Sequence, residues 1–256
     1  MEDIDLKMTR DSPIVKNNPK HIAFIMDGNN RWAKSKGFSP RVGYQHGAEA
    51  AKLVINACVD QAIPYVTLFA FSSENWVRPP GEIKSLMALF LTVLNRGEIQ
   101  QLHNNNVRLL FIGKRGNFSE KIQLGMKHAE DLTKHNVGTT VIVAADYGGR
   151  WDLVNSTLEI CNKIHSKELS AEQINEAMIN KHTSLGGFPD PDLCIRTGGE
   201  RRLSNFLLWH FAYTEFYFTD CFWPDFNKSE LKLALDDYAH RQRRFGGQNK
   251  TFRLGN

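Results

Sequence analysis

The chain has 256 residues, of which 41% are hydrophobic and 23% are charged, and this ordinary globular mixture excludes a disordered, fibrous or low-complexity protein. Its net charge of +4 permits an anionic ligand but falls short of the clustered basic excess of a nucleic-acid-binding protein. The four cysteines form no CxxC pair, which argues against a zinc site or a disulfide scaffold and favours a reducing compartment.

The amino terminus carries no targeting signal that we can identify. Residues 1–10, MEDIDLKMTR, contain no apolar stretch and therefore do not predict a signal peptide. No uncharged apolar run approaches the roughly 18 residues of a transmembrane helix. We therefore expect a cytoplasmic protein. Residues 1–19 are polar and contain Pro13 and Pro19, which predicts a flexible lead-in before a folded domain at 20–256.

From His21 onward, short apolar runs alternate with segments of helical periodicity. The apolar runs span residues 22–26, 65–71, 107–112, 139–145 and 192–195. Each run is continuous rather than alternating with polar residues, as is typical of strands buried in a parallel sheet.

The segments between these runs predict helices. In residues 82–95 one apolar face recurs at helical spacing, formed by Ile83, Leu86, Met87, Phe90, Leu91 and Leu94. Residues 48–62 carry a weaker stripe, and a capping-box-like start follows Ser170. The alternation predicts one α/β domain with a mostly parallel central sheet and helices on both faces. Residues 205–222 are dense in aromatic side chains, which suggests a packed wall or a subunit contact.

Three of the predicted strands end in polar segments. These are DGNNRW (27–32), SSENWVR (72–78) and RTGGERR (196–202). Ligands of parallel α/β sheets bind beyond the carboxyl ends of the strands, and arginine forks match phosphate oxygens. The three segments therefore predict one edge that binds one or two diphosphates.

Two of these segments leave alternatives open. Asp27 directly follows a buried strand, where it is either a turn residue that caps the next helix or a ligand of Mg²⁺ together with substrate phosphates. The arginines at the other strand ends favour the second role. Gly198 and Gly199 form either a simple hinge or a backbone cradle for phosphate. For Trp32 and Trp76, packing is the more common role.

Several standard sites are missing from the sequence. It has no GxxxxGK[ST] phosphate loop, no GxGxxG after the first strand and no GxSxG nucleophile elbow. The DDxxD motif of trans-type prenyl synthases is also missing, because Asp236 and Asp237 are followed by Tyr-Ala-His.

Five segments together resemble the cis-prenyltransferases, most closely the bacterial undecaprenyl diphosphate synthases. They are HIAFIMDGNNRWAK (21–34), TLFAFSSENWVRP (67–79), AADYGGRWD (144–152), DLCIRTGGERRLSNFLLWHFAYTEFYFTD (192–220) and RQRRFGG (241–247). They occur in the order of the family and span nearly the whole chain from His21.

The resemblance implies a fold and a reaction. The fold would be a parallel sheet of about six strands with an apolar product tunnel, in a homodimer. The reaction would be the Mg²⁺-dependent, stepwise condensation of isopentenyl diphosphate onto farnesyl diphosphate. Its product would be a long-chain polyprenyl diphosphate, the lipid carrier precursor for bacterial cell-wall synthesis. Ile83, Leu86, Met87, Phe90 and Leu91 would then line the tunnel rather than form ordinary core.

The resemblance also implies roles for individual residues. Asp27 would be the essential acid at the allylic diphosphate and the metal, which Glu215 would help to hold. Gly28, Asn29, Asn30, Arg31 and Trp32 would surround that diphosphate; Ser72, Ser73, Glu74, Asn75, Trp76 and Arg78 would form the transfer centre; Arg196, Arg202, Leu203 and Ser204 would bind isopentenyl diphosphate; and Arg244 would reach the partner subunit's site. The family gives Asn75 the proton-acceptor role. Because an amide has almost no basicity near neutral pH, we expect Asn75 to orient a water or phosphate oxygen instead.

The chain departs from the family in residues 40–47. Family members carry Arg-x-x-Gly-His-x-x-Gly there, and without a gap the arginine falls on Pro40 and the histidine on Tyr44. Arg41 and His46 are the candidates to replace them in substrate binding. Asn30 replaces a usual glycine, and Asp146 replaces a usual asparagine.

Three alternatives compete with a long-chain synthase. The first is a shorter-chain cis-prenyl synthase, because the sequence does not fix the product length. The second is a non-catalytic partner subunit, which the retained Asp27, Asn75 and Glu215 disfavour. The third is a nucleic-acid-binding protein that uses Arg241, Arg243 and Arg244. We expect no nucleic-acid partner. We expect membrane contact to be at most peripheral, through the lipid product.

Overall fold

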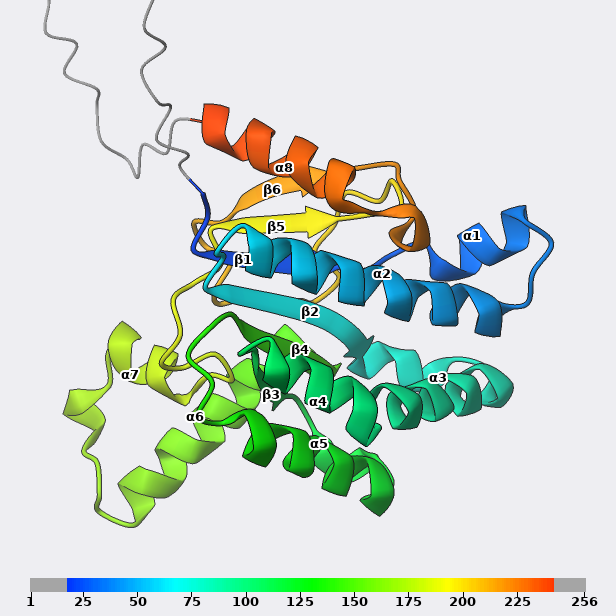
Figure 1. The fold of residues 1–256 in the computed structure, drawn as a ribbon. Helices are drawn as coiled ribbons and strands as arrows, with labels where there is room; N and C mark the ends of the chain where they lie inside the picture. The colour runs from blue at the N-terminus through cyan, green and yellow to red at the C-terminus, as the bar shows by residue number, and fades with distance from the viewer. Residues whose placement is uncertain (1–17, 242–256) are drawn as a thin grey trace, which may run out of the picture.

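The computed structural model describes residues 18–241, and at its centre six strands form one parallel sheet (Figure 1). The strand order is β3-β4-β2-β1-β5-β6. The strands are β1 (His21–Ile25), β2 (Tyr65–Ser72), β3 (Arg108–Ile112), β4 (Thr140–Tyr147), β5 (Leu193–Arg196) and β6 (Glu215–Phe218). All five pairings are parallel, so every carboxyl end lies at the same edge of the sheet.

The described part of the chain contains eight α-helices and four short 3₁₀ helices, all of which lie between strands except η4 and α8, which follow β6. The α-helices are α1 (Asn29–Ser35), α2 (Pro40–Asp60), α3 (Pro80–Val93), α4 (Arg96–Asn104), α5 (Glu120–Thr133), α6 (Gly149–His165), α7 (Glu176–His182) and α8 (Lys228–His240). The 3₁₀ helices are η1 (Ser73–Val77), η2 (Arg115–Asn117), η3 (Ala171–Gln173) and η4 (Trp223–Asp225).

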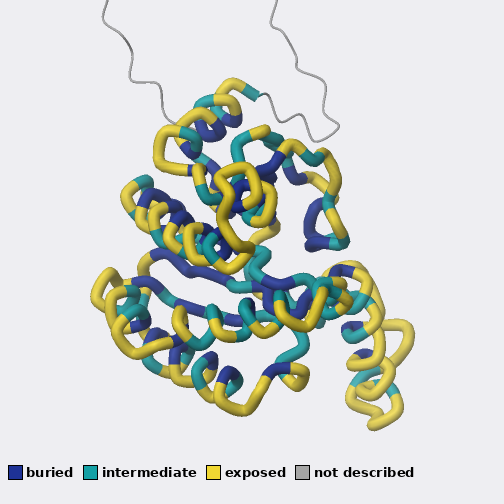
Figure 2. Tube along the Cα trace, turned by 90° about the vertical axis from the view of Figure 1, so that its right-hand side faces the viewer, coloured by how far each residue is buried: buried dark blue, intermediate teal, exposed yellow. Residues whose placement is uncertain are grey.

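The sheet separates two hydrophobic cores, because successive side chains of a strand point to opposite faces. Ile22 and Phe24 of β1 face the larger core, which includes residues of α2, α3, α4, α5 and α8. Ala23 and Ile25 face the smaller core, which is closed by the segment around Phe206. Buried positions accordingly run through the central strands, while exposed positions lie on the outer turns of the helices (Figure 2).

The predicted fold class and the five predicted strands are confirmed, each within a few residues of its expected bounds. The residue pattern did not predict β6, which is half-buried and lies within the aromatic segment. The weak stripe at 48–62 belongs to a longer helix, α2, which begins at Pro40. At Ser170 the capping box is present, but it starts only η3; the α-helix begins after the Asn175 cap.

The predicted lead-in, residues 1–19, lies almost wholly outside the described residues. Within residues 18–241, no helix is long and apolar enough to cross a membrane.

His21 anchors the amino end of β1. Its ring is fully buried, with Nδ1 2.7 Å from the Pro189 carbonyl oxygen and Nε2 2.7 Å from the Thr67 hydroxyl. A carbonyl can only accept, so Nδ1 carries the proton and Nε2 accepts from Thr67. Burial lowers the pKa of His21 from 6.5 to about 4, a shift that Asp192 partly opposes.

We predict that His21 makes the free energy of unfolding depend on pH. Above pH 6.5 the ring is neutral in both the folded and the unfolded chain; as the pH falls toward 4, only the unfolded chain gains the proton. The contribution of about 3 kcal/mol is therefore present above pH 6.5 and lost between pH 6.5 and 4. Denaturant unfolding measures the free energy of unfolding of the wild type and of His21→Gln at a series of pH values. The two plots of free energy against pH should converge between pH 6.5 and 4, and parallel plots would contradict the assignment.

Candidate active site

Asp27, Ser72 and Arg196 lie at the carboxyl edge of the sheet, as the sequence predicts. Ser72 and Arg196 end β2 and β5, and Asp27 lies two residues past β1. The register aligns Ile25 with both Arg196 and Phe69, which places these strand ends side by side. Three polar segments far apart in the sequence thus form one site.

An ion pair between Asp27 and Arg196 is the centre of this edge. The Arg196 side chain is only 4% exposed, and its Nη2 donates to Asp27 Oδ2 over 2.8 Å. Its Nη1 donates to the Ser204 hydroxyl, over 2.8 Å, and to the Arg202 carbonyl. Thr197 donates its hydroxyl to the Asp27 carbonyl over 2.7 Å. Arg196 therefore fixes both Asp27 and the loop that follows β5.

Arg31 is the exposed cation beside this pair. Its Nη2 lies 3.1 Å from Asp27 Oδ1, its Nη1 lies 3.8 Å from Glu200, and its guanidinium carbon lies 5.5 Å from the centre of the Phe222 ring. Its side chain is 45% exposed. A guanidinium that is held at one end and open to solvent is suited to bind phosphate oxygens of an arriving ligand.

Glycine is required at the turn between β1 and α1. Gly28 has φ +106°, and a Cβ on it would lie 2.6 Å from the Phe222 ring. Across the site, a Cβ on Gly198 would lie 2.7 Å from Arg31 Nη2. The backbone amides of Gly198 and Gly199 donate to the carbonyls of Cys221 and Thr219, over 2.8 and 2.9 Å. Both amides are thus already bonded within the chain and are not free to form a phosphate cradle.

The SSEN segment is a capped 3₁₀ helix rather than a loop. Asn75 Oδ1 accepts from the Ser72 amide over 3.0 Å, and Ser72 caps η1 in return. Glu74 accepts from the Ser72 hydroxyl and, over 2.6 Å, from Asn205 Nδ2. Both hydrogen bonds lower the pKa of Glu74 against the opposing effect of its desolvation. The Ser73 hydroxyl is buried without a hydrogen-bond partner.

Tyr44, which takes the position of the family histidine, binds Arg78. Arg78 Nη1 donates to the Tyr44 hydroxyl over 2.9 Å and to Glu82 over 2.7 Å, and Tyr44 donates to Glu82. Burial, together with the Glu82 carboxylate, raises the pKa of Tyr44, which therefore stays protonated. The network joins α2 to the start of α3 and orients Arg78 at the site.

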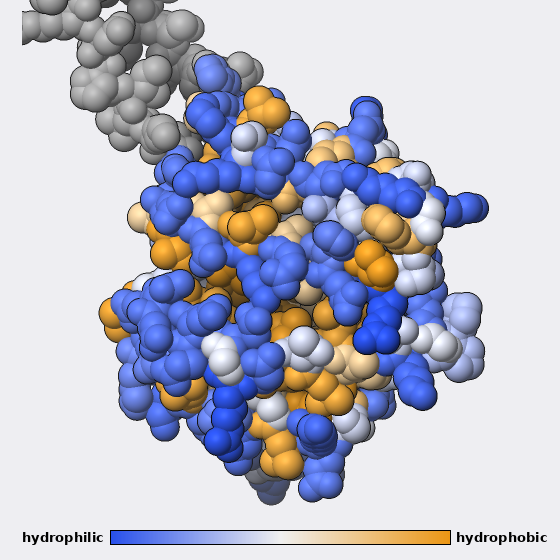
Figure 3. Space-filling model, turned by 45° about the vertical axis from the view of Figure 1, so that its right-hand side comes forward, coloured by the Kyte–Doolittle hydropathy of each residue, from blue (hydrophilic) through white to orange (hydrophobic). Residues whose placement is uncertain are grey.

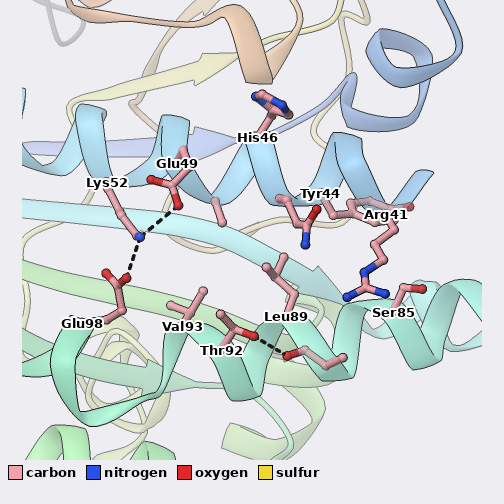
Figure 4. Close-up of a pocket in the computed structure, with 13 residues that line it drawn as sticks. Arg41, Tyr44, His46, Glu49, Lys52, Ser85, Leu89, Thr92, Val93 and Glu98 are labelled. Atoms are coloured by element: carbon pink, nitrogen blue, oxygen red, sulfur yellow. Dashed lines mark hydrogen bonds and ion pairs between the residues drawn. The ribbon is translucent and has the colours of Figure 1, made fainter. Parts of the chain in front are cut away.

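Four other predicted residues lie around this edge in packing or surface positions. Trp32 is buried and donates its indole N–H to Asp225 over 2.8 Å, and the His46 ring packs on it at 4.7 Å. Trp76 packs on Phe71 at 4.9 Å. The Arg41 side chain reaches toward α3 in an outer groove (Figure 4).

The remaining residues of the predicted isopentenyl diphosphate site follow β5. Arg202 is exposed and pairs with Glu200. Leu203 is half-buried against the smaller core, and Ser204 is held by Arg196. Arg244 lies outside the described residues. In α1, Asn29 is half-buried and its Nδ2 donates to the Met26 carbonyl over 3.1 Å, while Asn30 is exposed.

Glu215 does not join Asp27 within one chain. It begins β6 opposite Leu193, which pairs with Ile22, whereas Asp27 lies five residues beyond Ile22, about 16 Å along the strand direction. Its carboxylate accepts from Arg241 over 2.9 Å. Within the described residues of one chain, Asp27 and Glu215 therefore do not lie together, and their shared role at a metal stays a prediction.

An apolar cavity of about 310 Å³ extends from this edge into the larger core. Asn29, Tyr44, Asn75 and Arg78 are among its polar lining residues. Its apolar wall includes Ala51, Ile55, Leu68, Leu86, Leu89, Phe90, Val93, Ile99, Leu102, Leu109, Phe111, Val141 and Val143. The cavity is thus polar at its strand-end side and has a mostly apolar wall, but polar side chains in and next to α2 and α4 also line it: Lys52, Asn56, Glu98, Gln101 and Asn105.

The predicted tunnel wall is only partly correct. Leu86 and Phe90 line the cavity, whereas Ile83, Met87 and Leu91 do not; Met87 and Leu91 pack against the core instead. Leu89 and Val93 line it in their place. Apolar residues occupy most of the circumference of α3, so its periodicity could not identify the stripe that faces the cavity.

A second hollow, of about 330 Å³, lies between α2 and α3 and adjoins the tunnel cavity. Lys52 crosses it, 3.0 Å from Glu49 and 2.9 Å from Glu98 (Figure 4). Six residues line both this hollow and the tunnel cavity: Tyr44, Ala48, Lys52, Leu89, Val93 and Glu98. The space-filling view shows apolar side chains recessed among hydrophilic ones on this side of the molecule (Figure 3).

The residues at the edge fit Mg²⁺ only if substrate supplies most of its ligands. In the described range no three His, Cys, Asp or Glu side chains are grouped to hold a metal. Asp27 provides one carboxylate, 30% exposed, with both oxygens bound by arginines. Mg²⁺ commonly uses one or two carboxylates with phosphates and waters, which matches a single acid beside a diphosphate site.

A family model described as "Putative undecaprenyl diphosphate synthase" matches residues 25–246. The chain belongs to this family. It is 47% identical over 238 residues to an isoprenyl transferase of Neisseria gonorrhoeae, covering 93% of each chain. It is 49% identical over 229 residues to a farnesyl-diphosphate-specific ditrans,polycis-undecaprenyl-diphosphate synthase of Vibrio vulnificus, covering 89% of this chain and 90% of that protein.

Solved structures support the same fold. Lavandulyl diphosphate synthase from Lavandula x intermedia, in complex with dimethylallyl diphosphate, has a TM-score of 0.87 at 36% identity over 90% of this chain and 98% of that one. A probable undecaprenyl diphosphate synthase of Campylobacter jejuni has a TM-score of 0.74 at 32% identity, covering 90% and 99%.

We predict that Gly28→Ala lowers the free energy of unfolding more than a glycine-to-alanine substitution at another position of positive φ. The matched control is Gly37→Ala, where φ is +72° but nothing lies within 4 Å of the added Cβ. The control should lower the free energy of unfolding by about 1 kcal/mol. Gly28→Ala should lower it by about 2 to 3 kcal/mol, because Phe222 must also move. Thermal or denaturant unfolding measures both, and equal losses would contradict the packing described.

Proposed function

We propose that the protein is a cis-prenyltransferase that condenses isopentenyl diphosphate stepwise onto farnesyl diphosphate, with undecaprenyl diphosphate as its product. The observation that carries the proposal is the junction of a cation-rich strand edge with a hydrocarbon-lined cavity. Arg31 and Arg78 offer guanidinium groups at the edge, while Leu89 and Phe90 line the cavity beyond. This matches a substrate with a diphosphate head and a growing apolar tail.

The arginines and the cavity address the two requirements of the reaction. Departure of diphosphate from an allylic carbon leaves positive charge there, so the leaving group must be stabilised and water excluded. In our proposal Arg31 and Arg78 hold the allylic diphosphate, and the loop of Arg202 and Ser204 binds isopentenyl diphosphate. Mg²⁺ beside Asp27 would neutralise diphosphate charge as it develops.

Asn75 is proposed to orient the proton acceptor rather than to be the acceptor. Its Oδ1 already accepts from the Ser72 amide, and its side chain lines the cavity mouth. An amide oxygen engaged in a cap is a poor base. Its amino group can instead donate to a phosphate oxygen or water that removes the proton from isopentenyl diphosphate.

The cavity supports repeated addition. Each added five-carbon unit gains up to about 4 kcal/mol from burial, at about 0.8 kcal/mol per carbon. The wall formed by α2, α3 and the central strands is mostly apolar, which in our proposal favours elongation. A shorter product remains the alternative, because a lavandulyl diphosphate synthase has a very similar fold.

We further propose a homodimer in the cytoplasm with at most peripheral membrane contact through its lipid product. In the described residues β6 is an edge strand, paired only with β5, and its Phe216 and Phe218 are half-buried. An open, aromatic edge is suited to a second copy. Glu215 lies at that edge, so in our proposal it serves the metal site only across such an interface.

The proposal is tested by incubating the purified protein with farnesyl diphosphate, labelled isopentenyl diphosphate and either Mg²⁺ or a chelator. Mass spectrometry should detect a Mg²⁺-dependent ladder of polyprenyl diphosphates that ends at undecaprenyl diphosphate. An earlier end would support the shorter-chain alternative. The complete lack of incorporation by folded protein would contradict the enzymatic function and favour a non-catalytic partner subunit.

We predict that Leu89→Trp shortens the product, because Leu89 lines the cavity and a larger ring would fill it. Met87→Trp is the matched control: it enlarges a half-buried residue of the same helix that does not line the cavity. The product ladder should end earlier for Leu89→Trp and stay unchanged for Met87→Trp. The reverse result, or two unchanged ladders, would show that the cavity does not hold the growing chain.

A further inference from the structure

Asn205 joins three separate parts of the strand edge. Its Nδ2 donates to Glu74 Oε1 of η1 over 2.6 Å. Its Oδ1 accepts from the Arg150 amide over 2.9 Å, and its carbonyl accepts from the Gly149 amide over 2.6 Å, both in the first turn of α6. It directly follows Ser204, which is bound by Arg196.

The backbone around Asn205 has a strained conformation, which directs the side chain and the carbonyl of Asn205 toward η1 and α6. Ser204, Asn205 and Leu207 have φ values of +49°, +60° and +41°, although none is glycine. Left-handed conformations of this kind cost free energy and persist only where the surrounding contacts hold them. Asparagine tolerates the conformation better than most residues. The loop thus bends to place one side chain between η1 and α6.

Asparagine is also the one side chain of this size that can form hydrogen bonds with both the Glu74 carboxylate and the Arg150 amide. Its amino group can donate to the Glu74 carboxylate, while its oxygen accepts from the helix amide. Aspartate would keep the second bond but face Glu74 with a like charge. Gly148 lies against the same group, since a Cβ on it would lie 2.7 Å from Asn205 Nδ2.

We propose that Asn205 is a positioning residue that fixes the transfer centre of η1 relative to the isopentenyl diphosphate loop. This inference rests on the proposed function. One subsite, with Glu74 and Asn75, follows β2, and the other, with Arg202 and Ser204, follows β5. Asn205 donates to Glu74 of the subsite after β2 and directly follows Ser204 of the subsite after β5. It therefore sets the distance between the two substrates that must react.

A link of this kind acts on the rate of condensation more than on the affinity for either substrate. Each diphosphate keeps its own arginines when the link is broken, so its binding changes little. The reacting carbons, however, lose their alignment, and a displacement of about 1 Å can cost about 100-fold in rate. A merely structural role would instead lower stability, or weaken binding and rate together.

The test compares Asn205→Asp with Asn155→Asp. The control removes a similar bond, because Asn155 Nδ2 donates to Glu159 over 3.1 Å on the exposed side of α6. Calorimetry measures the dissociation constants of farnesyl diphosphate and of isopentenyl diphosphate separately, and single-turnover kinetics measures the first condensation. Thermal unfolding of each variant accompanies both. Asn205→Gly, which relieves the strained φ and keeps the backbone bond, replaces Asn205→Asp if that variant does not fold.

We expect Asn205→Asp to slow condensation by about tenfold or more, with both dissociation constants within about threefold of wild type. Adding Glu74→Gln should restore the rate to that of Glu74→Gln alone, because the new amide can donate to the introduced carboxylate. Asn155→Asp should match wild type in all three measurements.

Three results would overturn the proposal: Asn205→Asp that behaves like Asn155→Asp, a rate loss matched by an equal loss of binding, or no rescue by Glu74→Gln. Where Asn205→Gly is used, unchanged condensation would overturn it. These results are distinct from failure of the proposed function, in which the wild-type protein itself condenses no substrate.

Discussion

The ion pair between the buried Arg196 and the partly exposed Asp27 joins the ends of β5 and β1 and orders the strand edge around them. Because Arg196 is only 4% exposed, its guanidinium depends on this carboxylate and on its other acceptors to offset the loss of water. The same guanidinium binds Ser204 and the Arg202 carbonyl, which orders the loop after β5. Arg31, bound to the other Asp27 oxygen, stays exposed for a ligand.

The cavity begins where this edge ends, because the same elements form both. Strands β2, β3 and β4 supply the floor of the cavity, and α2, α3 and α4 supply its wall. Tyr44, Arg78 and Glu82 connect α2 to the start of α3 at its polar end. A charged head and an apolar tail therefore meet matching surfaces built from the same strands and helices, which is what a polyprenyl diphosphate requires.

The sequence predicted the sheet and its functional edge because buried strands are continuous apolar runs and three of these runs end in distinctive polar segments. It did not predict β6, whose aromatic residues are half-buried, nor the stripe of α3 that lines the cavity, because α3 is apolar on most sides. It also missed the contact of Asn205 with Glu74, which are 131 positions apart. Neither residue carries a local pattern that points to the other; only the folded edge brings them together.

The most direct test of this account is a crystal structure of the protein with farnesyl diphosphate bound. The account predicts the diphosphate on Arg31 and Arg78 beside Asp27, with the farnesyl chain in the cavity against Leu86 and Phe90. A chain lying in the outer hollow between Arg41 and Glu49, or a diphosphate away from the strand edge, would contradict it.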